Sequence, residues 1–256
     1  MTKKKKLIIG NFKMNPITLR EAKKIFLDIK RTANKLKNVQ TVICPPFVYL
    51  TELQKVVNGD RCVLGAQNVF SEIKGSQTGE ISSAMLSDLG IKYVILGHSE
   101  RRAIGETSRE IGSKIKLCLK YNLIPIICIG ENKRDESMEY LNFIKKQLQE
   151  SLEGLSSAMI KKIVIVYEPV WAIGKDAERD ATPEEVQEIN IFIRKILSDA
   201  FGHKVIMELT ILYGGSVSPT NACNFLEREI IDGFLIGRAS LQPEKFNEIL
   251  LMTQEI

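Results

Sequence analysis

The chain has 256 residues, of which 44% are hydrophobic and 26% charged, and its formal net charge is +5. This is ordinary globular composition, and a modest positive charge without interleaved aromatic and basic residues argues against nucleic-acid binding. No apolar run approaches the roughly 20 residues of a membrane-spanning helix, and only three apolar residues follow the initial lysines, so we expect neither a membrane segment nor a signal peptide.

Cysteine and histidine usage bounds the chemistry further. Five cysteines lie far apart without a Cys-x-x-Cys pair, and the only histidines are His98 and His203. An odd, scattered set of cysteines favours free thiols in a reducing cytoplasm over disulfides or structural zinc. With two histidines, a histidine-rich metal site is not available, and we expect no bound metal.

Short apolar segments rich in β-branched residues recur along the chain. Runs of this length predict strands buried on both faces, as in parallel sheets. The predicted strands are Leu7–Phe12, Thr41–Cys44, Cys62–Ala66, Tyr93–Leu96, Ile124–Ile129, Ile163–Tyr167, Leu209–Tyr213 and Gly233–Ile236.

Amphipathic helical stretches alternate with these strands. In the first of them, apolar residues recur at the i, i+3, i+4 spacing of a helix: Ala22, Ile25, Phe26 and Ile29. A later helix is expected to begin after Thr182, because Pro183 takes the first helical position and Glu185 completes a capping box.

The alternation predicts the fold class. Eight strand–helix units in about 250 residues are typical of a (β/α)8 barrel with eight parallel strands. A doubly wound sheet would usually have fewer strands and a glycine-rich fingerprint after the first one. No linker or shift in composition divides the chain, so residues 1–256 are predicted to form one domain.

A barrel of this kind carries its chemistry at the carboxyl ends of its strands. Polar residues and glycines collect at those positions: Asn11, Lys13, His98, Ser99, Glu100, Glu168, Gly214, Gly215, Ser216 and Gly237. Glu168 follows a buried strand and precedes Pro169, which favours a partly desolvated carboxylate with a tunable pKa. The alternative is a solvated acid in a loop.

The glycine-rich turns after the seventh and eighth strands are typical of a phosphate cradle, in which backbone N–H groups converge on an anion. Ser216, Gly237 and Gly174 are the candidate donors, although glycines in these places also simply make tight turns.

Three further groups complete the candidate site. Lys13 offers a cation on the same face as Asn11, and His98 stands where an apolar strand turns polar. Lys13 could equally be solvated, His98 a satisfied core histidine, and Glu100-Arg101-Arg102 a surface charge run. Taken together, an acid, an imidazole, a cation and a phosphate cradle suit proton abstraction beside the carbonyl of a phosphorylated substrate.

Five motifs closely resemble those of the triosephosphate isomerase family: Gly10–Asn15, Gly97–Arg102, Cys128–Glu131, Tyr167–Gly174 and Leu212–Val217. The resemblance runs from the first strand to the eighth. It implies a TIM barrel that interconverts dihydroxyacetone phosphate and D-glyceraldehyde 3-phosphate in glycolysis and gluconeogenesis, without a cofactor.

The resemblance also implies roles for residues. Glu168 would move the proton between carbons, neutral His98 would polarise the carbonyl, and Lys13, helped by Asn11, would stabilise the negative charge. Glu100 would lie behind Lys13, and the backbone of Gly174, Ser216 and Gly237 would bind phosphate. Cys128 matches a family cysteine near the base, although the residue type favours the role of a small buried hydrophobe.

The segment Phe70–Ser82 resembles the family loop that docks into a second subunit. Thr78 would then approach Asn11 of a second copy, which implies a homodimer.

The sequence departs from the family pattern in three places, of which the first is a spacing from Arg102 to Glu106 that is one residue shorter than usual. Arg238 replaces the second of two glycines after the eighth strand; its backbone N–H remains a candidate phosphate donor, and we expect its side chain to turn out of the pocket. The run Lys175–Pro183 is longer than usual and lacks a second glycine. Its charged residues, Asp176, Glu178, Arg179 and Asp180, are expected to lie in solvent.

Two other functions stay open from the sequence. One is a different phosphate-binding barrel that acts on a larger sugar phosphate. The longer run after Gly174 is the one feature that favours it. The other is a barrel without catalysis that serves as a binding protein, against which the intact Lys13, His98 and Glu168 argue.

Overall fold

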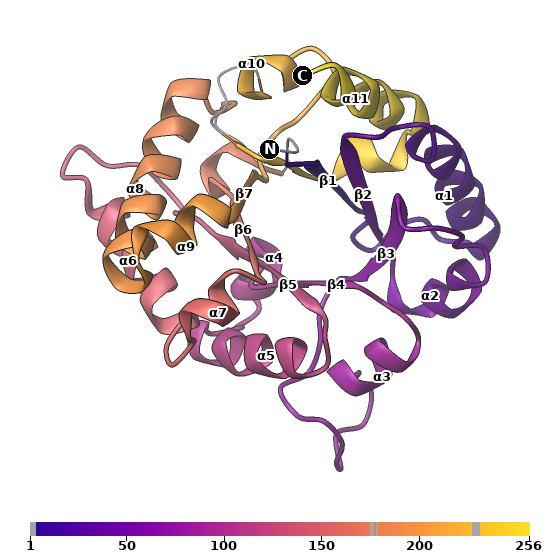
Figure 1. The fold of residues 1–256 in the computed structure, drawn as a ribbon, viewed down its shortest axis with the longest axis horizontal. Helices are drawn as coiled ribbons and strands as arrows, with labels where there is room; N and C mark the ends of the chain where they lie inside the picture. Colours follow the sequence, from indigo (N-terminus) through magenta and orange to yellow (C-terminus); the bar gives the residue numbers. More distant parts are fainter. Residues whose placement is uncertain (1–3, 175–176, 178, 227–230) are drawn as a thin grey trace.

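The structure is a computed structural model that describes residues 4–174, 177, 179–226 and 231–256. Eight parallel strands close into a barrel in sequence order, with β1 paired to both β2 and β8, and helices form the outer layer (Figure 1). The strands are β1 (Lys6–Asn11), β2 (Val39–Cys44), β3 (Cys62–Ala66), β4 (Tyr93–Leu96), β5 (Ile124–Ile129), β6 (Val164–Tyr167), β7 (Thr210–Tyr213) and β8 (Gly233–Ile236). The predicted (β/α)8 barrel is thus confirmed.

The helices follow the strands around the barrel. They are α1 (Leu19–Ala33), α2 (Phe47–Gln54), α3 (Ser83–Asp88), α4 (Ser99–Ala103), α5 (Ser108–Lys120), α6 (Glu139–Ser151), α7 (Ser157–Ile160), α8 (Pro183–Phe201), α9 (His203–Glu208), α10 (Ala222–Leu226) and α11 (Pro243–Glu255), with short 3-10 helices η1 (Val170–Ala172) and η2 (Arg238–Leu241). The predicted start of α8 is confirmed, because Thr182 caps it, Pro183 is at its first turn, and the Thr182–Glu185 capping box is present.

Side-chain alternation along the strands divides the core into two layers. One set of side chains fills the barrel interior: Leu7, Ile9, Val42, Cys44, Val63, Ile95, Ile126, Cys128, Val164, Val166, Leu212 and Leu235. The other set packs between the strands and the helices, and includes the α1 residues predicted from their spacing: Ala22, Ile25, Phe26 and Ile29. Because the period is two, the inner row fixes which later residues point into the barrel mouth.

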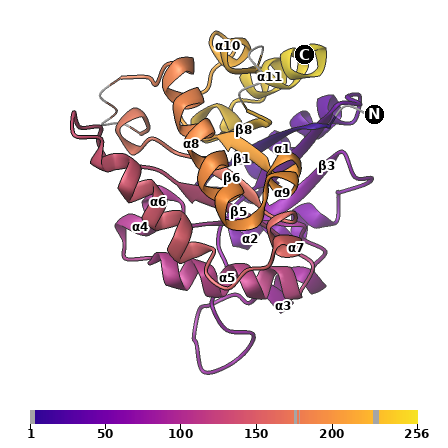
Figure 2. The same ribbon diagram turned by 60° about the vertical axis from the view of Figure 1, so that its left-hand side comes forward.

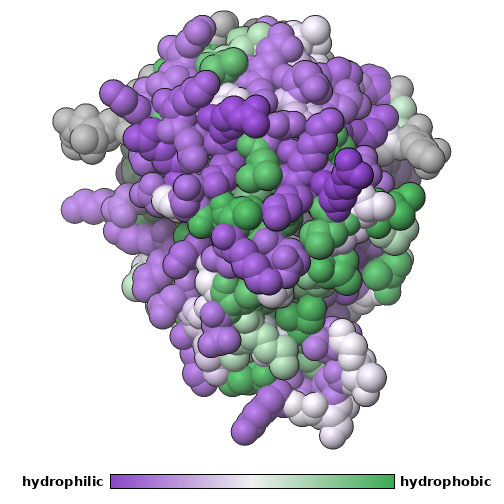
Figure 3. Space-filling model, turned by 90° about the vertical axis from the view of Figure 1, so that its right-hand side faces the viewer, coloured by the Kyte–Doolittle hydropathy of each residue, from purple (hydrophilic) through white to green (hydrophobic). Residues whose placement is uncertain are grey.

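The segment between β3 and α3 projects from the body of the barrel, below α3 in Figure 2. Its tip around Thr78 is exposed. Large apolar side chains are also exposed after β1 and at the start of α2, namely Met14, Ile17 and Val48 at 93%, 92% and 78%. The face in Figure 3 shows apolar side chains, in green, above the projection and set among hydrophilic ones.

All five cysteines are free thiols, four of them buried. Within the part of the chain that the structure describes, no helix is both long and apolar enough to span a bilayer.

Candidate active site

Glu168 reaches the barrel mouth because it continues the inner row of β6, two residues after Val166 and four after Val164. Its side chain is only 3% exposed. The Oε2 atom accepts a hydrogen bond from the Ser99 backbone N–H at 3.2 Å, and Oε1 lies 3.3 Å from Nε2 of His98. A buried carboxylate and an imidazole therefore meet at the top of the barrel.

Glycines make the room for this carboxylate. A Cβ on Gly214 would lie 2.8 Å from Cγ of Glu168 and 2.7 Å from Cγ1 of Val166. A Cβ on Gly130 would lie 1.9 Å from the Glu168 carbonyl oxygen. All three distances are shorter than non-bonded contacts allow. The residues that follow β5 and β7, next to Glu168, therefore have to be glycines without a side chain.

His98 is held by the turn between β4 and α4. Gly97 takes the left-handed conformation, with φ of 67°, and His98 is the N-cap of α4. Its Nδ1 accepts from the Glu100 backbone N–H at 3.2 Å. An Nδ1 that accepts a hydrogen bond carries no proton, so the proton of the neutral ring is on Nε2, the atom that faces Glu168.

Lys13 is fixed in a backbone conformation that non-glycine residues seldom adopt, with φ of 53°. Its N–H donates to Oδ1 of Asn11 at 3.0 Å, and its carbonyl accepts from Gln67 at 2.8 Å. Its Nζ lies 2.6 Å from Oε1 of Glu100. These contacts hold the strained turn and point the ammonium at the site.

A cavity of about 810 Å³ joins these groups to the glycine-rich turns. Its lining includes most of the residues predicted from sequence: Asn11, Lys13, His98, Glu100, Glu168, Gly174, Ser216, Gly237 and Arg238. The structure therefore brings together residues from the ends of five strands, β1, β4, β6, β7 and β8. Thr78 lies outside this set, on the exposed projection.

The turns after β7 and β8 adjoin the cation. A Cβ built on Gly237 would lie 3.3 Å from Cε of Lys13, and Ser216 Oγ donates to the Ala172 carbonyl at 3.2 Å. Arg238 differs from expectation. It was expected to turn away, yet it lines the cavity, and its Nη2 lies 3.5 Å from the Gly174 carbonyl oxygen, an acceptor that the long side chain reaches across the mouth.

Comparison with known proteins agrees with this geometry. The family model for triosephosphate isomerase matches residues 6–253. The triosephosphate isomerase of Fusobacterium nucleatum is 43% identical over 246 residues, which cover 95% of this chain and 97% of that protein. That of Alkaliphilus oremlandii is 41% identical over 249 residues, covering 96% and 99%. The chain belongs to the triosephosphate isomerase family. It is thus a member of a family of intramolecular aldose–ketose isomerases.

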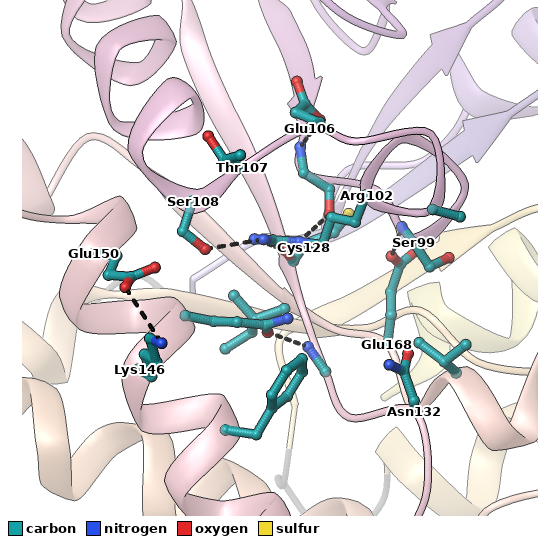
Figure 4. Close-up of a pocket in the computed structure, with 17 residues that line it drawn as sticks. Ser99, Arg102, Glu106, Thr107, Ser108, Cys128, Asn132, Lys146, Glu150 and Glu168 are labelled. Atoms are coloured by element: carbon teal, nitrogen blue, oxygen red, sulfur yellow. Dashed lines mark hydrogen bonds and ion pairs between the residues drawn. The ribbon is translucent and has the colours of Figure 1, made fainter.

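The family motif Gly97–Arg102 is more than a surface charge run. Glu100 is exposed, but Arg102 is half-buried and donates to the Gly97 carbonyl at 2.8 Å, to Ser108 Oγ at 3.0 Å and to the Cys128 carbonyl at 3.2 Å. Figure 4 shows Arg102 between Ser108 and Cys128, in a second cavity of about 500 Å³ that also reaches Glu168. Arg102 thereby braces the turn that presents His98.

Cys128 lies in the barrel interior and is 1% exposed. Burial raises the pKa of its thiol well above the ordinary value, and the adjacent Glu168 carboxylate raises it further. The thiol therefore stays protonated and packs as a small side chain beneath the carboxylate, which fits the apolar interpretation of this residue.

Sequence reasoning missed the role of Glu131, although it quoted the motif that contains it. Glu131 is 1% exposed, and its Oε1 accepts from Tyr167 Oη and from Trp171 Nε1, both at 2.8 Å. Arg134 lies 3.4 Å away. The signal was similar to the one used for Glu168: an acid close to the end of a buried strand, here two residues after Ile129.

Of the long run after Gly174, residues Lys175, Asp176 and Glu178 lie outside the described part of the chain. Arg179 and Asp180 are exposed as expected, but Asp180 lines the cavity and Arg179 contacts Trp171 and Glu185. Among the described residues, no group of three or more His, Cys, Asp and Glu side chains is arranged to hold a metal ion.

Proposed function

We propose that this protein interconverts dihydroxyacetone phosphate and D-glyceraldehyde 3-phosphate through an enediolate, without a cofactor, in cytoplasmic glycolysis and gluconeogenesis. The observation that carries the proposal is the contact of 3.3 Å between Glu168 and His98 at the wall of a cavity that also holds Lys13. The family to which the chain belongs supports the same reaction.

Glu168 is the base. Its carboxylate removes a proton from the carbon next to the carbonyl and returns it to the neighbouring carbon, which exchanges aldose and ketose. The nearly complete burial of the side chain favours this transfer, because water does not compete for the carboxylate.

His98 is the electrophile. Since Nδ1 is occupied by the Glu100 N–H, the Nε2 proton is available to the substrate oxygen and can pass between the two enediolate oxygens. Lys13 supplies positive charge to the same oxygens, and Asn11 keeps the Lys13 backbone in place through its contact of 3.0 Å. Glu100 orients the Lys13 ammonium through their ion pair of 2.6 Å.

The phosphate binds at the turns after β7 and β8, which offer the backbone N–H groups of Ser216, Gly237 and Arg238. Gly174 adds a donor from the segment after η1. This cradle anchors the non-reacting end of the substrate, and so places the reacting carbons between Glu168 and His98.

Two copies of the chain form the working enzyme. The projecting segment Phe70–Ser82 carries an exposed tip with few charges, and the apolar side chains of Met14, Ile17 and Val48 are exposed after β1 and at the start of α2. A second copy would cover these side chains and bring Thr78 to the Asn11 of its neighbour.

The test is a coupled assay with each triose phosphate as substrate, in which the product is consumed by a nicotinamide-dependent dehydrogenase. Turnover in both directions supports the proposal. Turnover of a larger sugar phosphate alone would favour a different sugar-phosphate barrel, and no turnover at all would favour a binding protein.

A further inference from the structure

The only tryptophan in the chain, Trp171, lies within cation–π distance of two guanidinium groups. The guanidinium carbon of Arg179 lies 4.6 Å from the ring centroid and that of Arg134 lies 5.6 Å from it. The indole Nε1 donates to Glu131 at 2.8 Å. The ring, which is 5% exposed, is therefore fixed at its edge and by two cations.

Glu185 connects the two cations. Arg179 makes a two-pronged contact with it, at 2.8 Å from Nη1 and 2.5 Å from Nη2, and Arg134 Nη1 lies 3.8 Å away. Glu185 is itself fixed, because it accepts from the Thr182 N–H at 2.8 Å in the capping box of α8. Arg179 thus ties the run after Gly174 to the start of α8, over the face of Trp171.

Trp171 belongs to η1, which begins two residues after Glu168. The Val170 N–H donates to the Glu131 carbonyl at 2.9 Å, so both the backbone and the ring of this turn are anchored to Glu131, two residues after the end of β5. A movement of the turn has to stretch or break the contacts of Trp171.

The proposed reaction requires such a movement, because the substrate needs the space that the contact between Glu168 and His98 closes. At 3.3 Å there is no space between the two side chains for a carbon and an oxygen that both must touch. The Glu168 carboxylate also accepts from Ser99 at 3.2 Å. The reaction therefore needs a second arrangement of Glu168, in which its carboxylate leaves both partners.

We propose that Arg179, itself held by Glu185, is a positioning residue that stabilises the arrangement in which Glu168 contacts His98, by keeping the Trp171 ring in its hydrogen bond to Glu131. Substrate binding then has to break or weaken these contacts of Trp171, which raises KM. The inference rests on the proposed function, because it needs a substrate that displaces Glu168, and it assigns a role to the longer run that distinguishes this chain from its family pattern.

The experiment compares Arg179→Gln with the parent, with Arg179→Lys and with Arg31→Gln. Arg31 is a matched control, since it is an exposed arginine on α1 that pairs with Asp28 at 3.5 Å. Intrinsic fluorescence reports on Trp171 alone, because the chain has no second tryptophan. Steady-state kinetics and thermal unfolding are measured on the same samples.

In Arg179→Gln we expect a red-shifted emission, greater quenching by acrylamide, and a KM lowered two- to fivefold with kcat within twofold of the parent. This change in KM corresponds to about 0.4–1 kcal/mol. Arg179→Lys keeps the cation but loses the two-pronged contact with Glu185, so its emission and KM should lie between those of the parent and Arg179→Gln. Arg31→Gln should match the parent in both.

An emission spectrum and KM equal to those of the parent would overturn the inference. So would a raised KM, since it would show that Arg179 supports the substrate-bound arrangement instead. A parent protein without isomerase activity refutes the proposed function separately, and the fluorescence of the unliganded variants still reports whether Arg179 holds Trp171.

Discussion

At the scale of single residues, the site separates side chains that face the substrate from those that hold them. Glu168, His98 and Lys13 line the cavity. Gln67, Arg102 and Glu131 instead form hydrogen bonds with backbone and ring atoms near them. Buried polar groups with several partners resist reorientation, and this is the requirement for a base and an electrophile placed to a fraction of an ångström.

Arg238 tests the phosphate end of the cavity. Its guanidinium lines the cavity near Gly174, so Arg238→Gln removes a cation that would face the phosphate dianion of the proposed substrate. Because the side chain is exposed, we expect KM to rise by only about three- to tenfold, with kcat within twofold. Kinetics at low ionic strength, with the exposed Arg109→Gln as control, provide the measurement. A KM within twofold of the parent would indicate that the Arg238 side chain does not bind the phosphate, and that the backbone N–H groups bind it alone.

At the scale of elements, strand periodicity places the reactive groups. Gly214 continues the inner row of β7 next to Glu168, and a Cβ there would overlap Cγ of Glu168 at 2.8 Å. In Gly214→Ala we expect kcat to fall at least tenfold, because a displacement of the carboxylate by about 1 Å is costly to catalysis. The unfolding free energy should fall by only about 1–3 kcal/mol. An unchanged kcat would show that the position of Glu168 is not critical.

The Arg179–Glu185 pair makes a prediction about pH. The hydrogen bonds from Arg179 lower the pKa of Glu185 from 4.5 to about 2. A depressed carboxyl pKa stabilises the fold above the unfolded value, and this contribution is lost as pH falls from 4.5 towards 2. Urea unfolding of the parent and Glu185→Gln should therefore differ by a constant amount from pH 7 to pH 5, and by less at pH 3.5. A difference that persists undiminished at pH 3.5 would contradict the lowered pKa.

The same element scale shows what the sequence could predict. The bounds of β3, β4, β5 and β8 agree with those predicted, since each is a short apolar run ended by a turn residue. Period-two alternation then places Asn11 and Glu168 on the inner face. The contacts of Arg179 and Arg102 were not predictable in this way, because their partners are chosen by tertiary packing across separate elements.

At the scale of the whole molecule, the proposed homodimer makes a prediction about the projection between β3 and α3. Two charges at the tip of the projection, Gln77→Glu with Thr78→Asp, should yield monomers with greatly reduced activity, because desolvating a charge at an interface is unfavourable. The control places the same charges on α5 and α8, as Ser113→Asp with Gln187→Glu. Sedimentation checks the result, and an active monomer of the parent protein would refute the dimer.

The central claim is that Glu168 carries the substrate proton between carbons. Its most direct test is conversion of D-glyceraldehyde 3-phosphate in D2O, followed by proton NMR, for the parent, Glu168→Gln and the exposed control Glu153→Gln. We expect the parent and the control to form dihydroxyacetone phosphate that carries deuterium from solvent. Glu168→Gln, which has the same shape but no basic oxygen, should be slower by about a hundredfold to ten-thousandfold. Isomerisation by Glu168→Gln within tenfold of the parent rate would contradict the account.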